Sequence, residues 1–279
     1  ASRGRAARPG QESIDMKRLC ERHASSLCLM VAAMLLASGG VRAEEARFSL
    51  SVGAEYTTGD YGGEESVDET YVPVTAALEL ERVSLRLTVP YLSVRAPELT
   101  TISGPDGQPI VGEGPRITES GLGDVLASVT VFDVLTAAGG DVAMDLTGKV
   151  KFGTADADKG LGTGEQDYLL QADLYRFFER STLMATAGYA VRGEPDGLEL
   201  DDTLFASVGL SHAVADGARI GAFFDYREAS VTGTDAIQEL SVFASTRLGQ
   251  RGSWRFYALG GFGDSSPDWG GGLSFSTSF

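Results

Sequence analysis

Residue types suited to acid–base or nucleophilic chemistry are sparse in this 279-residue chain. It contains two histidines, His23 and His212. Ser211 precedes His212, but successive side chains of an extended strand point to opposite faces, so this serine and this histidine cannot act as nucleophile and base. We interpret His212 as an interfacial aromatic residue near a strand end. We therefore expect no catalytic residue and no enzymatic activity.

Sites for a cofactor or a metal are also poorly supported. The run Gly160-Leu161-Gly162-Thr163-Gly164 is rich in glycine, but no helix pattern follows it, as a phosphate-binding loop requires. We interpret this run as a flexible loop. Both cysteines, Cys20 and Cys28, precede residue 44, and no cluster of histidines is present. We expect no cofactor and no dedicated metal centre.

Two acidic clusters leave one question about cations open. The first consists of Asp60, Glu64, Glu65, Asp68 and Glu69, and the second of Glu194, Asp196, Glu199, Asp201 and Asp202. Close carboxylates can bind Ca²⁺ through their oxygens, or they can simply be solvated. The formal net charge of −16 argues against nucleic acid as a partner, because binding to nucleic acid needs a basic surface.

The final segment, 268–279, shows what kind of element must position these residues. Apolar side chains occupy one parity and serines the other, as in a strand with one apolar face. The apolar set is Trp269, Leu273, Phe275 and Phe279, and the polar set is Ser274, Ser276 and Ser278. A terminal aromatic residue on such a strand resembles the sorting signal of bacterial outer-membrane barrels. It implies recognition of Phe279 by the barrel-assembly machinery.

The beginning of the chain has the pattern of a secretory leader. Met16-Lys17-Arg18 is basic, 27–37 is apolar but too short to span a membrane, and Val41-Arg42-Ala43 is a small-x-small cleavage site. We expect residues 1–15 to be an unnatural upstream extension and 16–43 a signal peptide. The remainder, 44–279, is expected to be one domain.

Segments of alternating hydrophobicity, each long enough to cross a membrane as a tilted strand, recur throughout this domain. We place them at 47–57, 70–80, 82–94, 121–134, 142–153, 166–178, 182–193, 202–214, 218–230, 237–249, 253–264 and 268–279. Short turns alternate with longer polar links. This predicts an all-β fold, a transmembrane antiparallel up-and-down barrel of about twelve strands. The expected location is the outer membrane of a Gram-negative-type bacterium, with lipid and lipopolysaccharide as partners and both termini on the periplasmic side.

Aromatic residues of the apolar parity collect at the two ends of the strands. Those near the long links are Tyr56, Tyr91, Phe152, Tyr168, Tyr189, Tyr226, Phe262 and Trp269, and those near the short turns are Phe48, Phe178, Trp254 and Phe279. Amphipathic rings prefer the two membrane–water interfaces. The polar parity must then face the interior, because a charge on the lipid face near the midplane would cost about 2–4 kcal/mol.

Charged residues of the polar parity are candidates for the lumen. They include Arg86, Asp124, Asp225, Arg227, Glu239 and Arg247. Twelve strands lie between eight, which side chains can fill, and sixteen, which leave an aqueous channel, so we expect at most a narrow lumen. The mixed charges fit either a pore lining or a salt-bridged plug of side chains.

The longest link, 95–120, contains four prolines and four glycines at 97–115, a composition that excludes a regular helix or a central strand. It also carries Ile102, Ile110 and Val111, more apolar surface than a freely solvated loop would keep. A link of this length in a compact fold is usually functional or disordered. We expect it to fold over or into the outer mouth, with Asp124 beneath it.

The motif Ser120-Gly121-Leu122-Gly123-Asp124 stands where this link enters the next strand. Glycines at such a position allow the backbone to bulge or kink. With this motif and the terminal aromatic strand, the chain resembles the outer-membrane family named for the meta-pathway of phenol degradation. The resemblance implies transport of small solutes, hydrophobic or aromatic ones among them. The residues alone leave a second interpretation, a non-conducting structural or surface-interaction barrel whose acidic loops bind cations.

Overall fold

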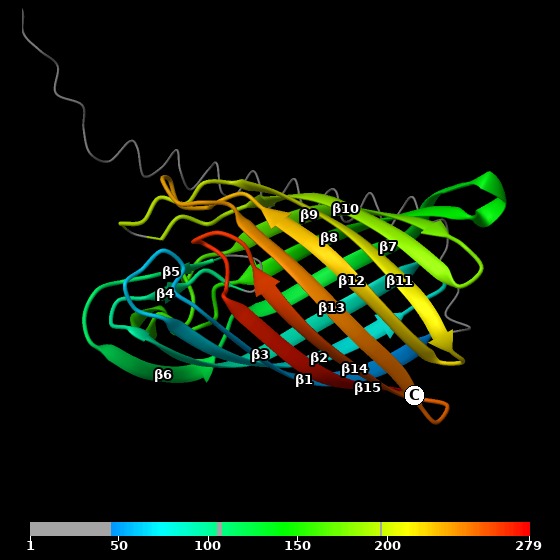
Figure 1. Cartoon of the computed structure of the whole chain (residues 1–279), viewed down its shortest axis with the longest axis horizontal. Coiled ribbons are helices and arrows are strands. Elements are labelled where there is room, and N and C mark those ends of the chain that lie inside the picture. The colour runs from blue at the N-terminus through cyan, green and yellow to red at the C-terminus, as the bar shows by residue number, and fades with distance from the viewer. Residues whose placement is uncertain (1–45, 105–107, 196) are drawn as a thin grey trace, which may run out of the picture. The chain divides into compact units, whose positions relative to one another are not determined.

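The computed structural model describes residues 46–104, 108–195 and 197–279, and these form an antiparallel β-barrel (Figure 1). The expected upstream extension and signal peptide lie outside the described residues. The barrel strands are β1 (Arg47–Gly59), β2 (Val67–Glu79), β3 (Val83–Pro97), β7 (Val125–Ala137), β8 (Val142–Phe152), β9 (Asp167–Phe177), β10 (Ser181–Val191), β11 (Thr203–Ala215), β12 (Ala218–Arg227), β13 (Ile237–Leu248), β14 (Gly252–Gly261) and β15 (Trp269–Ser278). Three further strands, β4 (Thr101–Ile102), β5 (Pro109–Ile110) and β6 (Arg116–Leu122), lie between β3 and β7.

The sheet closes on itself. Each barrel strand pairs with its neighbours in sequence, and β15 pairs with β1, with Ser278 opposite Ser49. At the seam, the Phe279 backbone N–H donates to the Phe48 carbonyl at 2.9 Å. The predicted closed barrel of twelve strands is therefore confirmed for the described residues. Closure also removes the exposed strand edges that an open sheet would present.

The fourth barrel strand differs from the prediction of one uninterrupted strand at 121–134. It breaks at Gly123 and Asp124 into β6 and β7, and β3 pairs with both pieces. Gly123 donates its N–H to the Pro90 carbonyl at 3.0 Å, and a Cβ at Gly123 would lie 2.7 Å from Leu92 Cδ1. A side chain at Gly123 would press against Leu92 and Pro90, so glycine suits this close approach at the break.

The link after β3 is also more regular than expected. Its residues 116–120 belong to β6, which continues the ladder with β3 up to the pair Pro97–Arg116, while β4 and β5 form a small hairpin. The prolines and glycines do not prevent these strands, because Pro97 and Pro115 stand where the β3–β6 ladder ends. In Figure 1, β6 projects beyond the barrel at the same end as β4 and β5.

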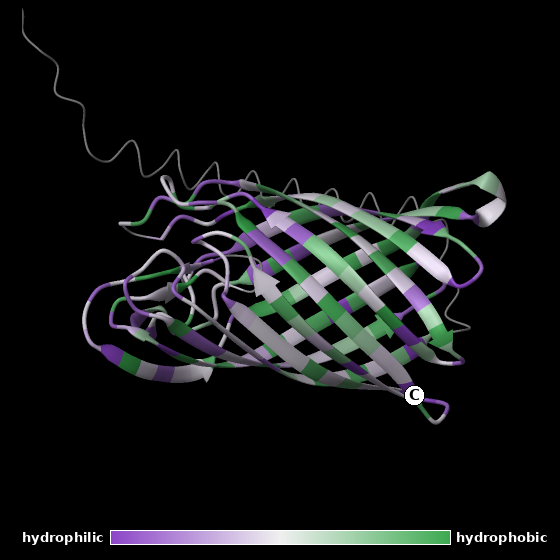
Figure 2. Cartoon of the chain, viewed as in Figure 1, coloured by the Kyte–Doolittle hydropathy of each residue, from purple (hydrophilic) through white to green (hydrophobic). Residues whose placement is uncertain are grey.

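The outer surface carries an apolar band across the middle of the strands, seen as green stripes in Figure 2. Residues of the predicted outward parity are exposed, among them Leu87, Val89, Leu183, Leu204, Val208, Leu210, Leu240, Val242 and Leu273. An exposed apolar belt of this extent is the lipid-facing surface of a transmembrane barrel. No helix among the described residues has the length and apolar character needed to cross a membrane.

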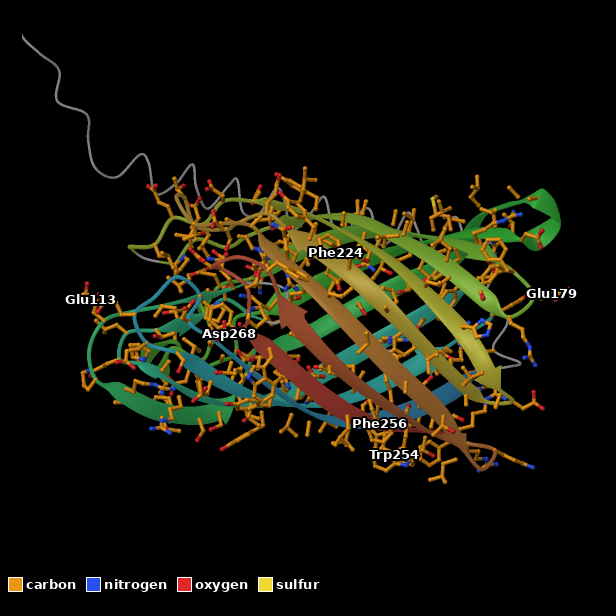
Figure 3. The ribbon with its side chains drawn as sticks, in the orientation of Figure 1. Glu113, Glu179, Phe224, Trp254, Phe256 and Asp268 are labelled. Carbon is orange, nitrogen blue, oxygen red and sulfur yellow. The ribbon has the colours of Figure 1, made fainter. Side chains whose placement is uncertain are left out.

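Aromatic rings border the band at both ends. Tyr56 and Trp269 lie 5.4 Å apart, between ring centroids, at the long-loop end, and Phe48 and Phe279 lie 5.8 Å apart at the short-turn end. Trp254 and Phe256 lie next to each other on the outer surface of β14 (Figure 3). Arg176, an outward cation, lies 3.9 Å from the Asp141 carboxylate and over the Phe178 ring, so it reaches toward the short-turn rim.

Candidate functional site in the barrel interior

The link between β3 and β6 packs against the barrel at the long-loop end of the interior. Ile102 is 3 % exposed and packs in an apolar cluster with Leu92, Val94 and Leu161. Its N–H donates to the Gly160 carbonyl at 2.9 Å, joining the β3–β6 link to the loop 153–166. Of the other expected mouth residues, Val111 packs against the same cluster and Ile110 is half-buried in β5.

A buried ionic network lies next to this cluster. Lys151 Nζ is 3.4 Å from the Asp124 carboxylate and 3.2 Å from that of Asp167, and Arg192 is 3.1 Å from Asp167. The side chains of Lys151, Asp124 and Asp167 are each at most 3 % exposed. Two cations match two carboxylates, as burial of charge requires. Asp124 Oδ1 also accepts the N–H groups of Thr154 and Ala155, both at 2.9 Å.

Asp124 is therefore placed at the long-loop end, with its carboxylate directed into the network that holds the loop 153–166. The glycine-rich run of this loop serves close packing, which the interpretation as a flexible loop missed. A Cβ at Gly162 would lie 2.8 Å from Asp124 Oδ2, and one at Gly160 would collide with the Thr100 carbonyl. The loop can approach the carboxylate and the neighbouring link only because these residues lack side chains.

Below the link lies a cavity of about 220 Å³ whose lining is acidic and rich in tyrosine. Glu55, Glu69 and Glu239 contribute carboxylates from three strands, and Gly104, Gln108 and Pro109 of the link cover it. Arg227 and Glu239, both expected in the lumen, form an ion pair at 2.7 Å. Tyr257 is hydrogen-bonded to Glu55, and burial raises the pKa of the Tyr61 hydroxyl in the adjoining loop.

A second cavity, of about 210 Å³, lies along β9 to β12. Asp225, another expected lumen residue, lines it together with Phe205 and Arg227. Arg86, the remaining candidate on β3, is exposed and stands in register with Ala77 and Ser128 of the neighbouring strands.

Aromatic side chains on the interior face form a feature that the parity argument missed. Each covers a glycine of a neighbouring strand, where a Cβ would collide with the ring. The pairs are Phe205 over Gly188, Phe223 over Gly209, Phe243 over Gly221, and Tyr257 over Gly272. Phe223 and Phe243 stack with ring centroids 5.8 Å apart. The sequence contains a signal for this feature. Each of these aromatic residues has the inward parity of its strand, and each stands opposite a glycine once the two strands are aligned.

The short-turn end of the interior has a basic lining. A cavity of about 310 Å³ is bordered by Arg219, Arg247 and Arg255 from β12, β13 and β14. Arg219 Nη2 donates to Ser211 Oγ at 2.7 Å and to Thr182 Oγ1 at 3.3 Å, and the Arg255 guanidinium lies 5.6 Å from the Phe243 ring centroid. The lining of this cavity is basic, whereas that of the cavity below the β3–β6 link is acidic.

In the part of the chain that the structure describes, residues suited to catalysis or metal binding are not brought together. Ser211 faces Arg219 in the interior, while the His212 ring Nδ1 lies 2.9 Å from Ser181 Oγ across the β10–β11 pair. No group of three or more metal-ligating side chains gathers among residues 46–104, 108–195 and 197–279. Within these ranges the two acidic clusters therefore do not form a compact cation site.

No family model and no curated protein match the sequence. Among solved structures, the barrel is similar to the COG4313 outer membrane channel from Pseudomonas putida F1, at 15 % identity and a TM-score of 0.64, over 86 % of this chain and 97 % of that one. It is also similar to the KdgM porin, at 7 % identity and a TM-score of 0.50, over 82 % and 99 % of the two chains. These likenesses show the fold, and the exposed apolar belt is that of a transmembrane β-barrel.

Proposed function

We propose that the chain is an outer-membrane channel for small solutes, hydrophobic or aromatic ones among them. The observation that carries this proposal is the lining of the interior. Separate cavities lie below the β3–β6 link, along β9 to β12 and at the short-turn end. Phe205, Phe223, Phe243 and Tyr257 stand on the interior face. Rings offer apolar contact area to a passing solute that a purely polar lumen would lack.

The fold of the similar solved structures agrees with a channel, and the resemblance to the family of the phenol meta-pathway suggests the solute class. In this proposal the long loops face the exterior and the short turns the periplasm, because outer-membrane barrels have short periplasmic turns and longer outer loops. The link between β3 and β6 is then a constriction at the outer mouth, held by Ile102 and by the Lys151 network.

Conductance of the refolded protein in planar bilayers tests the channel. We expect discrete, small conductance steps from preparations that keep the heat-modifiable mobility of a folded barrel on gels. A folded barrel that inserts into liposomes, shown by flotation, and yields no conductance and no solute uptake would contradict the proposal.

Orientation has its own test by cysteine labelling of intact cells. Asp158 lies in a long loop and Asp216 in a short turn. With Asp158→Cys and Asp216→Cys made separately, a membrane-impermeant maleimide should label the first and spare the second. Labelling of Asp216→Cys alone would reverse the assigned orientation.

The second candidate function, a closed barrel with cation-binding loops, finds no compact carboxylate site in the described residues. A calorimetric titration with calcium separates the two candidates. We expect no heat of binding and no thermal stabilisation, whereas a saturable calcium signal together with absent conductance would favour the second candidate.

A further inference from the structure

The basic cavity at the short-turn end has the geometry of a single anion site. Arg219 stands in register with Ser245, and Ser245 with Arg255, so the two arginines flank one serine across three adjacent strands. Arg247 lies two residues beyond Ser245 and therefore on the same face of the sheet. Opposite residues on neighbouring strands are about 5 Å apart, which brings three long guanidinium side chains within reach of one small ligand.

These three cations lack the partners that other interior cations have. Lys151, Arg192 and Arg227 each lie within 3.4 Å of a carboxylate. Among the described residues, no ion pair joins Arg219, Arg247 or Arg255 to a carboxylate, and the cavity lining contains no Asp or Glu. Three guanidinium groups around one cavity repel each other, and an anion between them would relieve that repulsion through charge-assisted hydrogen bonds.

The position of the cavity adds an aromatic component. Arg219 is held by hydroxyl acceptors from Ser211 and Thr182, so its guanidinium is oriented before any ligand binds. Arg255 lies against Phe243, whose ring stacks on Phe223. The three arginines thus lie next to the interior aromatic side chains of Phe243 and Phe223. A ligand with a planar anionic group on an aromatic ring would contact both surfaces, and guanidinium forks match a carboxylate in particular.

We infer that Arg219, Arg247 and Arg255 form a binding site for aromatic carboxylates at the short-turn mouth of the lumen. This inference rests on the proposed function. It narrows the class of transported solute to aromatic compounds that carry a negative charge. The acidic cavity under the β3–β6 link, lined by Glu55 and Glu69, lies at the opposite end.

Isothermal titration of the refolded full-length barrel in detergent tests the site, with benzoate, benzyl alcohol and acetate as probes. We expect benzoate to bind most tightly, because benzyl alcohol lacks the charge and acetate the ring. Arg247→Gln and Arg255→Gln should each weaken benzoate binding about tenfold, the loss of roughly one charge-assisted contact. Phe243→Leu should bring benzoate down to the affinity of acetate.

Arg251→Gln is the matched control, because Arg251 is exposed in the turn between β13 and β14 and does not line the cavity. It should leave benzoate binding unchanged. Strand content by circular dichroism and gel mobility verify folding of every variant. Absence of benzoate binding, equal binding of benzoate and benzyl alcohol, or equal loss in Arg251→Gln and Arg255→Gln would overturn the site.

Because the titration needs no ion current, its result separates the two proposals. A folded barrel that binds benzoate but never conducts would retain the site and lose the channel. A barrel that conducts but ignores benzoate would retain the channel and lose the site.

Discussion

The two ends of the barrel interior treat charge in opposite ways. At the long-loop end, Lys151 and its two carboxylates are almost fully buried, and each charge has an opposite partner. At the short-turn end, Arg247 and Arg255 are exposed, and no carboxylate of the described residues is paired with them. An unpaired charge is very costly in free energy when it is buried, whereas an exposed charge can be solvated and needs no partner. One end thus uses charge to build structure, and we propose that the other keeps charge available for a ligand.

Removing the buried cation should have the largest effect on this contrast. Lys151→Met leaves Asp124 and Asp167 facing each other without their shared cation, and we expect a loss of about 3–5 kcal/mol in the local stability of the long-loop end. The loss of stability can be measured by the rate of proteolytic cleavage within 153–166 in the folded barrel, and by urea unfolding. Lys159→Met, at an exposed position of the same loop, is the control and should change neither. Equal protease resistance of Lys151→Met and the parent would show that the network does not hold the loop.

Deleting residues 100–114 should remove the cover of the long-loop end and leave the short-turn end untouched. Ile102, Gln108 and Pro109 would be lost from the mouth, so we expect a several-fold rise in single-channel conductance or in solute uptake by liposomes. Gel mobility before and after heating verifies that the barrel is intact. If an intact deletion variant conducts no better than the parent, the link is a surface flap and not a constriction.

A smaller effect is expected where the interior aromatics cover glycines. In Gly209→Ala the added methyl group would collide with the Phe223 ring, and we expect a destabilisation of about 1–3 kcal/mol together with displacement of that ring. Gly260→Ala is the control, since the nearest atom to a Cβ at Gly260 is 3.7 Å away. Urea unfolding in detergent and the near-ultraviolet circular dichroism spectrum compare them. A Gly209→Ala barrel as stable as Gly260→Ala would mean that the ring adapts without cost.

The barrel itself could be predicted because two local rules agree along the chain. Parity sorts Leu204, Val208 and Leu210 to one face, and short turns such as 215–217 alternate with long links, so the number of strands follows. The aromatic residues at the strand ends then identify the apolar face as the outward one. The break at Gly123 was not predictable in detail. It depends on the contact with Leu92 and Pro90 of another strand, which a single strand pattern does not encode.

The interior was harder to predict for a related reason. Asp124, Asp225 and Arg247 were assigned to the inward face from parity. Asp124 lies in the break between β6 and β7 within the buried network, whereas Asp225 and Arg247 line two separate cavities. Parity cannot say which inward charge is buried with a partner. The pairing of Asp124 with Lys151 joins β7 to β8 at the long-loop end, and the role of Gly162 depends on how the loop 153–166 folds back.

The seam between the first and last strands governs how the barrel can form. Ser49 meets Ser278, and the terminal residue donates its backbone N–H to Phe48, so the contacts that complete the ring join the extremes of the domain. Such non-local pairing is slow, because the entropy of closing the whole chain must be overcome before the seam is stabilised. Until then β1 and β15 each present an unpaired edge that can pair with another chain. A chain that lacks β15 should therefore accumulate as aggregates and not as a smaller barrel.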